Sequence, residues 1–349
     1  MSKAEREAEG KRVCDLRTEM GVFDVAITIV VAGTGFRAVQ KFLRQVVPDA
    51  RCDMIDSAVL RTAGFDAEVL IPAMARIDET MMDRIRGLRM IHQWGAGLEG
   101  VDIAAATARQ IAVANVPSTG GNADSVAEWC VMAAIALSRR LPSALETIRS
   151  GTVWGAPIGR TLLGRTAGIV GLGGIGQALA VRLRPFGMRL IGIKRRPDAA
   201  LASRLGFEWA GGLERLPELL RQSDYLFLCV PLNDQTRGLI DEAAFALMPP
   251  EACVVNAARG GLIEHQALLR VLSEGRLMGA GLDVFEQEPL DPSSPLLSRP
   301  DVLATAHIAG VTDTSYRSIA HALADNLRRL EAGEPLKNCV NCDAIGGHP

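Results

Sequence analysis

Three polar side chains in the last third of the chain have the types needed for acid–base chemistry on a carbonyl compound. Arg259, Glu288 and His307 each lie at or just beyond the end of an apolar run that predicts a strand. Histidine changes charge near neutral pH, so His307 can donate or accept a proton, and a neighbouring Glu288 carboxylate would stabilise its protonated form. Arginine stays charged and presents a planar fork of donors, so Arg259 can bind a carboxylate and polarise a carbonyl. The set suits reduction of a ketone, in which hydride addition creates an alkoxide that must receive a proton.

Each of these residues also has an ordinary structural explanation when it is taken alone. Arg259 could pair with a surface acid, Glu288 could be solvated beside Pro289, and His307 could be a hydrogen-bonded histidine at a strand end. Their joint position favours a catalytic set, because open α/β sheets bind ligands at the carboxyl ends of their strands. The remaining histidines are interpreted as structural: His92, His265, His321 and His348.

A glycine-rich loop supplies the second piece of chemistry. Its sequence, GLGGIG, follows the apolar run Ala167–Val170 and opens the helix-like stretch Gln177–Leu183. A strand, a glycine turn and a helix in this order let backbone N–H groups reach a pyrophosphate. The pattern predicts a dinucleotide site, with a purely structural glycine turn as the alternative. The residues expected to bind the cofactor here are Gly171, Gly173, Gly174, Ile175 and Gly176.

The next predicted strand ends in three cations, Lys194, Arg195 and Arg196, where an NAD site would carry a carboxylate. Cations at this point suit the extra phosphate of NADP, and an arginine fork matches it better than an ammonium group does. Two alternatives stay open, namely a solvated basic turn and a ribose contact from Asp198. We therefore expect an NAD(P) cofactor, with NADP(H) favoured over NAD(H).

Short apolar runs rich in valine, isoleucine and leucine alternate with helix-length segments along most of the chain. This alternation predicts an α/β fold with parallel sheets and crossover helices. The predicted strands form two sets, 27–32, 67–73, 88–94 and 111–116, followed by 166–171, 190–194, 225–231, 252–258, 278–284 and 302–308. Predicted helices cover 37–47, 79–86, 123–141 and 313–330, with Asn122 as the expected cap of the third.

The two strand sets predict two domains, which a length of 349 residues allows. The last helix is expected to return to the first half of the chain. A doubly wound nucleotide-binding domain, residues 122–311, would then be inserted into a smaller substrate domain made of 1–121 and 312–349, with a cleft between the two as the site.

Composition is that of an ordinary globular chain, with 48% hydrophobic residues, 22% charged residues and a net charge of -2. No charge field favours nucleic acid or membrane lipid as a partner. The charged N-terminus and the shortness of the longest apolar stretch, 129–137, predict a cytoplasmic protein. Seven scattered cysteines predict reduced thiols, Cys339 and Cys342 are interpreted as an ordinary tail feature, and no metal site is expected.

From about residue 88 to residue 340 the chain resembles the D-isomer-specific 2-hydroxyacid dehydrogenase family, which includes glyoxylate/hydroxypyruvate reductases and phosphoglycerate dehydrogenases. The matching stretches, in order, are GAGLEGVD at 95–102, NADSVAE at 122–128, LLGRTAGIVGLGGIG at 162–176, VPLNDQT at 230–236, NAARGGLIE at 256–264, GLDVFEQEPL at 281–290 and TAHIAG at 305–310. Ala306 departs from the usual proline of the last stretch, which would loosen a backbone constraint without removing a catalytic group.

The resemblance implies a fold, a partner and site roles. The fold would be two Rossmann-like domains, the smaller one flavodoxin-like, and the partner a second copy in a homodimer, with the 123–141 helix as a contact. Arg259, Glu288 and His307 would be catalytic, and Asp283 would contact the nicotinamide end of the cofactor. Val230, Pro231 and Ala257 would join the cofactor pocket, and backbone N–H groups of Ala96, Gly97 and Leu98 would join Arg259 in binding the substrate carboxylate.

The resulting functional prediction is an NAD(P)-dependent oxidoreductase that transfers a hydride between a nicotinamide cofactor and a small 2-keto or D-2-hydroxy acid, with glyoxylate or hydroxypyruvate favoured. Trp94, close to the carboxylate loop, is expected to limit the substrate side chain. The alternative is a dinucleotide-sensing binding protein without significant turnover, because relatives of this fold include a transcriptional corepressor.

Overall fold

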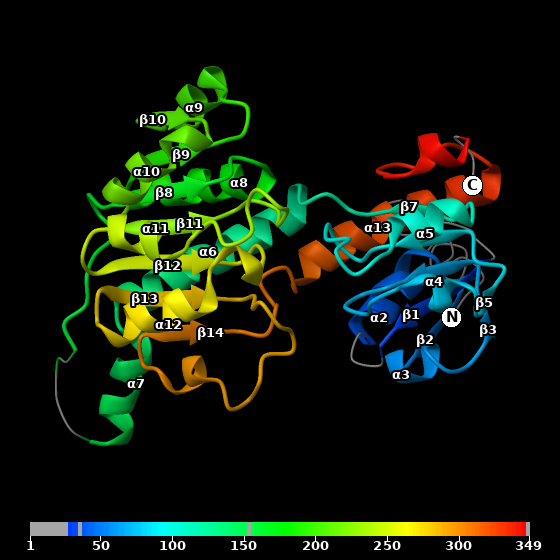
Figure 1. The fold of residues 1–349 in the computed structure, drawn as a ribbon, viewed down its shortest axis with the longest axis horizontal. Coiled ribbons are helices and arrows are strands. Elements are labelled where there is room, and N and C mark those ends of the chain that lie inside the picture. Colours follow the sequence, from blue (N-terminus) through cyan, green and yellow to red (C-terminus); the bar gives the residue numbers. More distant parts are fainter. Residues whose placement is uncertain (1–26, 34–36, 152–154, 156, 347–349) are drawn as a thin grey trace, which may run out of the picture. The chain divides into compact units, whose positions relative to one another are not determined.

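The computed structural model describes residues 27–33, 37–151, 155 and 157–346, so the N-terminal extension and His348 lie outside the described residues. The chain divides into two compact units (Figure 1). Unit 1 comprises residues up to 118 together with those from 316 onward, and unit 2 comprises residues 119–315. The domain boundaries expected at 121/122 and 311/312 lie a few residues from these positions.

Unit 1 contains a five-stranded parallel sheet in the order β2-β1-β4-β6-β7. This is the flavodoxin-like strand order, with the first strand second from one edge. The strands are β1 (Thr28–Ala32), β2 (Arg51–Ile55), β4 (Val69–Ile71), β6 (Met90–His92) and β7 (Ala112–Ala114), and β3 (Phe65–Asp66) pairs separately with β5 (Ile85–Arg86). The helices are α2 (Arg37–Val46), α3 (Ser57–Leu60), α4 (Glu79–Met82), α5 (Ile103–Ala108), α13 (Asp313–Ala332), which begins in unit 2, and the 3-10 turn η5 (Cys342–Ile345).

Both faces of this sheet are buried because successive side chains of each strand point to opposite sides. Ile29 and Val31 of β1 join a core cluster with residues of α2 and α13. Val30, between them, joins the opposite cluster with residues of α3 and α4. The continuous apolar run of β1 therefore follows from helices covering both faces.

Unit 2 contains a seven-stranded parallel sheet in the order β10-β9-β8-β11-β12-β13-β14, the Rossmann order with one added strand. The strands are β8 (Thr166–Val170), β9 (Arg189–Ile193), β10 (Trp209–Gly211), β11 (Tyr225–Leu228), β12 (Ala252–Asn256), β13 (Leu277–Leu282) and β14 (Val302–Ala304). The α/β class and the Rossmann architecture predicted from the sequence are confirmed.

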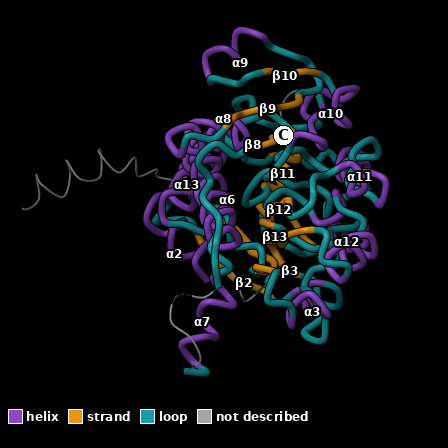
Figure 2. The backbone as a smooth tube through the Cα atoms, turned by 90° about the vertical axis from the view of Figure 1, so that its left-hand side faces the viewer, coloured by secondary structure: helices purple, strands orange, loops and turns teal. Residues whose placement is uncertain are grey.

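Helices cover both faces of the unit 2 sheet, with α6 and α8 on one side and α10, α11 and α12 on the other (Figure 2). The α-helices are α6 (Gly120–Ser138), α7 (Leu141–Arg149), α8 (Gly174–Leu183), α9 (Ala199–Leu205), α10 (Leu216–Gln222), α11 (Glu242–Leu247) and α12 (His265–Ser273). Short 3-10 turns are η1 (Arg184–Phe186), η2 (Leu213–Arg215), η3 (Gly260–Leu262) and η4 (Pro295–Ser298).

Several local predictions were wrong. Strands β2 and β10 were not predicted because each is a sheet edge with a weak apolar pattern, as in RCDMI of β2, where one residue is buried. Asn122 is not a cap: α6 begins earlier, after Thr119, and Asn122 Oδ1 instead accepts a hydrogen bond from Ser315 Oγ at 3.2 Å. The predicted helix 79–86 ends at Met82, and its last residues form β5.

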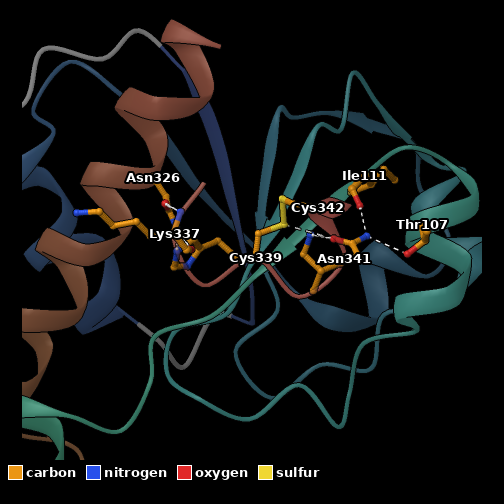
Figure 3. Close-up of a disulfide and its surroundings, with 9 residues drawn as sticks. Thr107, Ile111, Asn326, Lys337, Cys339, Asn341 and Cys342 are labelled. Carbon is orange, nitrogen blue, oxygen red and sulfur yellow. Dashed lines mark hydrogen bonds between the residues drawn. A yellow bond between two sulfur atoms is a disulfide. The ribbon is translucent and has the colours of Figure 1, made fainter. Parts of the chain in front are cut away.

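The prediction of reduced thiols is wrong for one pair, because Cys339 and Cys342 form a disulfide (Figure 3). A turn brings their Cα atoms to 5.6 Å, a separation that C-x-x-C spacing alone does not determine. The other described cysteines are free thiols. Within the described ranges, no helix is long and apolar enough to cross a membrane, and no group of three or more histidine, cysteine or acidic side chains could hold a metal ion.

Candidate active site

His307 and Glu288 form a direct hydrogen bond at the carboxyl end of the unit 2 sheet. His307 follows β14, Glu288 follows the neighbouring β13, and His307 Nδ1 lies 2.8 Å from Glu288 Oε2. The other carboxylate oxygen, Oε1, accepts a hydrogen bond from Phe285 N at 2.9 Å. The histidine side chain is 40% exposed and the glutamate 19%, so the imidazole faces solvent while its partner is held behind it.

The surroundings of Glu288 favour its ionised form. Burial alone would raise the pKa of this carboxyl, but the hydrogen bonds from His307 and Phe285 N–H and the charges of His307 and Arg259 lower it below its ordinary value. An ionised carboxylate can only accept, so Nδ1 of the imidazole carries a proton toward it. Nε2 is then the ring nitrogen left to exchange a proton with a bound molecule.

A buried carboxylate, Asp283, holds the turn that carries His307. Its Oδ1 accepts hydrogen bonds from Thr305 Oγ1 at 2.6 Å and Ile308 N at 2.8 Å, and its Oδ2 accepts one from Ala309 N at 2.7 Å. His307 has φ +55°, a left-handed conformation unusual for a side-chain-bearing residue. Burial raises the pKa of Asp283, although these hydrogen bonds oppose the rise. Asp283 is therefore the anchor of a strained turn.

Sequence reasoning missed this anchoring role and assigned Asp283 to the cofactor. Thr305, a hydroxyl donor two residues before His307, was the available signal. The predicted cofactor contact stays a prediction.

Arg259 is carried by a loop that packs against the loop of Glu288. A Cβ atom on Gly260 would collide with the backbone of Phe285 and Glu286, so only glycine permits this approach. Asn256, at the end of β12, braces the Arg259 loop by donating to Arg259 O at 2.9 Å and accepting from Ala258 N at 3.1 Å. The structure thus brings Arg259 and Glu288 onto adjoining loops, and Asn256 is a second support that sequence reasoning missed.

The glycine loop has the shape required of a phosphate-binding turn. Gly171 has φ +103°, and a Cβ on it would lie 2.6 Å from Cys229 O. A Cβ on Gly176 would collide with Gly171 O, whereas Gly173 faces open space directly before α8. The first N–H groups of α8, from Gly174, Ile175 and Gly176, have no partner within the helix and can receive an anion.

The other predicted cofactor residues lie at the same edge of the sheet. Val230 and Pro231 follow β11, which pairs with β8, and Ala257 follows β12. Residues of the described chain therefore fit a dinucleotide at this edge.

The basic turn after β9 leaves its cations available. Among the described residues, none hydrogen bonds or ion pairs with the side chains of Lys194, Arg195 or Arg196, and both arginines are exposed. Asp198, the alternative ribose ligand, is the N-cap of α9, with Oδ1 accepting from Leu201 N at 2.9 Å.

The predicted carboxylate loop of unit 1, residues 95–98, follows β6 and is held by its carbonyl groups. Gln93 Nε2 donates to Gly97 O at 2.8 Å, and Asn115 Nδ2 donates to Ala96 O at 2.7 Å. In the part of the chain that the structure describes, nothing accepts from the N–H groups of Ala96, Gly97 and Leu98. These donors are left for a ligand.

Trp94, expected to limit the substrate side chain, lies instead against the core of unit 1. Its ring makes an edge contact with Tyr316 at a centroid distance of 5.4 Å, and its indole Nε1 is buried without a hydrogen-bond partner in the described structure. Its predicted role in selectivity stays a prediction.

Comparison with known proteins agrees with this geometry. Residues 131–309 match the model of the D-isomer specific 2-hydroxyacid dehydrogenase, NAD binding domain, family. A glyoxylate reductase of Thermococcus litoralis is 32% identical over 93% of this chain and 98% of the relative. The chain belongs to the D-isomer specific 2-hydroxyacid dehydrogenase family.

Other members of this dehydrogenase family extend the comparison. A D-3-phosphoglycerate dehydrogenase of Methanocaldococcus jannaschii is 34% identical over 80% of this chain, which spans about half the length of that relative (53%). The apo-structure of D-lactate dehydrogenase from Escherichia coli superposes with a TM-score of 0.79 at 30% identity, covering 90% of this chain and all of that one. The family resemblance predicted from the sequence is therefore confirmed.

Proposed function

We propose that the protein is an NAD(P)-dependent reductase of a small 2-keto acid. In the reverse direction it would oxidise the corresponding D-2-hydroxy acid. The observation that carries this proposal is the His307–Glu288 hydrogen bond, because it provides a solvent-facing acid–base group fixed by a carboxylate. Glyoxylate and hydroxypyruvate are the favoured substrates, and relatives named glyoxylate reductase support the first.

Each site residue has a separate role in the proposed reaction. The nicotinamide cofactor, when bound, supplies or accepts the hydride. Arg259 binds the carboxylate of the acid and polarises its carbonyl, and in unit 1 the N–H groups of Ala96, Gly97 and Leu98 are donors suited to a carboxylate. His307 Nε2 gives its proton to the alkoxide in reduction and takes it back in oxidation, while Glu288 compensates the charge of the imidazolium.

We propose NADP(H) as the preferred cofactor. Support comes from the 194–196 turn, whose cations make no hydrogen bond or ion pair with other described residues, and from Asp198, the alternative ribose ligand, which caps α9. Replacing Lys194 and Arg195 by glutamine should weaken NADPH binding by about tenfold or more while leaving NADH within about twofold, since one phosphate is read by these charges. Equal weakening of both cofactors, measured by fluorescence titration, would contradict the preference.

We also propose that unit 2 binds the dinucleotide, that unit 1 binds the acid, and that the partner is a second copy. The dimer contact was expected on the 123–141 helix, but most of α6 is buried within unit 2. We therefore propose α7, which has no buried residue, as the helix that contacts the second copy. It exposes Leu141, Leu145 and Ile148, spaced as one helical stripe. Sedimentation of the Leu145→Glu, Ile148→Glu variant should show a monomer where the parent chain is a dimer. The cytoplasmic location stays a prediction.

The deciding experiment follows consumption of NADPH and NADH with glyoxylate, hydroxypyruvate and a series of longer 2-keto acids. Turnover with any of them supports the reductase, and the ratio between cofactors tests the basic turn. Cofactor binding without reduction of any acid would reject the reductase proposal and favour the dinucleotide-sensing alternative.

A further inference from the structure

The C-terminal segment 337–342, which carries the disulfide, is attached to the edge of the unit 1 sheet beside β7. Val340 N donates to Val113 O at 2.8 Å, Asn115 N donates to Asn338 O at 3.3 Å, and Cys339 bridges Ala114 in antiparallel fashion. Since β7 is the last strand of the sheet, this segment covers an edge that would otherwise expose unpaired backbone groups.

Asn341, inside the loop that the disulfide closes, makes three hydrogen bonds, of which two are buried and one is partly buried. Its Oδ1 accepts from Val113 N at 2.8 Å, and its Nδ2 donates to Thr107 Oγ1 and Ile111 O, both at 2.9 Å (Figure 3). The residue is 5% exposed. Its amide therefore substitutes for a missing neighbouring strand, and the short loop between the cysteines places it there.

The same segment is tied to the other strand that flanks the carboxylate loop. Lys337 N donates to Asn326 Oδ1 at 2.8 Å, and Asn326 Nδ2 lies 2.9 Å from Lys337 O and 3.0 Å from His92 Nε2. His92 ends β6 directly before Gln93. The disulfide segment is thus connected to the ends of both strands from which the 95–98 loop is held, directly at Asn115 and through Asn326 at His92.

We propose that Cys339 and Cys342 form a thiol–disulfide switch that sets how firmly the 95–98 loop is held, and hence how well unit 1 binds the carboxylate of the acid. The inference rests on the proposed function for its effect on the substrate. Closing the loop removes conformations from the segment around Asn341, and opening it restores them. Both cysteines are partly exposed beside the exposed Val340, so a small thiol reagent can reach them.

The redox step balances with one co-reactant. In the closing direction the two thiols lose two protons and two electrons as the Sγ–Sγ bond forms, and a low-molecular-weight disulfide accepts the electrons and protons as its own bond breaks into two thiols. A low-molecular-weight dithiol reverses the step. Cys52, Cys130 and Cys253 are buried, and burial raises the pKa of each thiol, which disfavours their competing reaction.

The test compares the full-length protein after dithiothreitol treatment with the same protein reoxidised by oxidised glutathione. In the reduced form, amide hydrogen exchange at Val113 and Val340 should accelerate by about tenfold or more. KM for the keto acid should rise by about three- to tenfold, while kcat and the dissociation constant for NADPH change by less than about twofold. Alkylation and mass spectrometry identify which cysteines respond.

Three variants sharpen the result. Cys339→Ser, Cys342→Ser should behave as the reduced form and ignore both reagents, whereas Cys52→Ala, a cysteine of the same unit, should keep the full redox response. Asn341→Ala should remove most of the difference between the two redox forms, because that difference is transmitted through its amide.

Equal exchange and equal KM in the two forms of the parent protein would overturn the switch, as would failure of oxidised glutathione to close the pair. Faster exchange in the reduced form of a protein that turns over no keto acid would reject the proposed function while supporting redox control of the loop.

Discussion

Each of the two candidate binding regions lies at the carboxyl ends of the strands of its own parallel sheet. The two regions differ in the chemistry that holds the groups expected to contact ligand. In unit 2 these groups are side chains, and carboxylates support them: Asp283 anchors the His307 turn and Glu288 binds its imidazole. In unit 1 these groups are backbone N–H donors, and neutral amides of Gln93 and Asn115 hold the loop by its carbonyls. Support by carboxylates suits proton transfer, whereas support by amides keeps one geometry at every pH. Changes in unit 2 should therefore affect kcat, and changes in unit 1 should affect KM.

The largest effect is expected from the histidine of unit 2. His307→Ala should lower kcat by about a hundredfold or more, because it removes the imidazole that is proposed to transfer the proton, while NADPH binding stays nearly constant. His265→Ala, a histidine on α12 outside the pair, is the control and should retain activity. Stopped-flow turnover and fluorescence titration measure the two quantities, and an unchanged kcat would remove His307 from the mechanism.

The second-largest effect on kcat is expected from Asp283, which anchors the His307 turn. Asp283→Asn replaces one accepting oxygen by an NH2 group that faces a donor, so a buried N–H or hydroxyl loses its partner. We expect kcat to fall about 10- to 100-fold with little change in KM for the acid. Asp291→Asn, an exposed neighbour in the sequence, should have no such effect. A loss confined to KM would show that Asp283 does not act through His307.

A smaller effect, on the other kinetic constant, is expected in unit 1. Gln93→Ala frees Gly97 O and Trp94 N, so the 95–98 loop should become less ordered and KM for the keto acid should rise by about three- to tenfold at constant kcat. Gln40→Ala removes a comparable amide-to-carbonyl bond, to Cys52 O, elsewhere in this unit and serves as the control. A drop in kcat without a change in KM would break the distinction between the two regions.

The smallest effect at neutral pH, and a clear one in acid, is expected from His92. Burial lowers the pKa of His92 to about 4 from 6.5, so the folded protein keeps the imidazole neutral while the unfolded chain takes up a proton. Stability is therefore complete above pH 6.5 and is lost as the pH falls toward 4, by on the order of 3 kcal/mol. Urea unfolding of His92→Gln should show a weaker loss over this pH range, and identical slopes would contradict the assignment.

Much of the fold and the candidate catalytic set could be predicted because their signals are local. The glycine loop does lie between a strand and a helix, as predicted, and Arg259, Glu288 and His307 do follow strands β12, β13 and β14, while their roles stay predictions. Strands β2 and β10 were not predicted because each is a short segment with few buried apolar residues, such as RCDMI, and so lacks the apolar run that marks the other main strands.

The residues that support the site loops were also not predicted from the sequence. Asn256 braces the Arg259 loop through contacts close in sequence, but Asn341 reaches Ile111 and Thr107 across more than two hundred residues. No pattern of spacing connects such partners. The C-x-x-C pair was likewise interpreted as an ordinary tail, because only the turn that joins the two cysteines shows them bonded.

The sequence by itself determined the α/β class and the family and supplied the candidates for the reacting side chains, since hydrophobic periodicity and residue chemistry are properties of short segments. The tertiary structure alone decided how those side chains are held. A left-handed turn at His307 is fastened by the buried Asp283, and the 95–98 loop is fastened by the side-chain amides of Gln93 and Asn115, so both depend on contacts that a short stretch of sequence does not specify. Such contacts form only when the sheets bring strand ends together, because a buried polar group must find its partner in space.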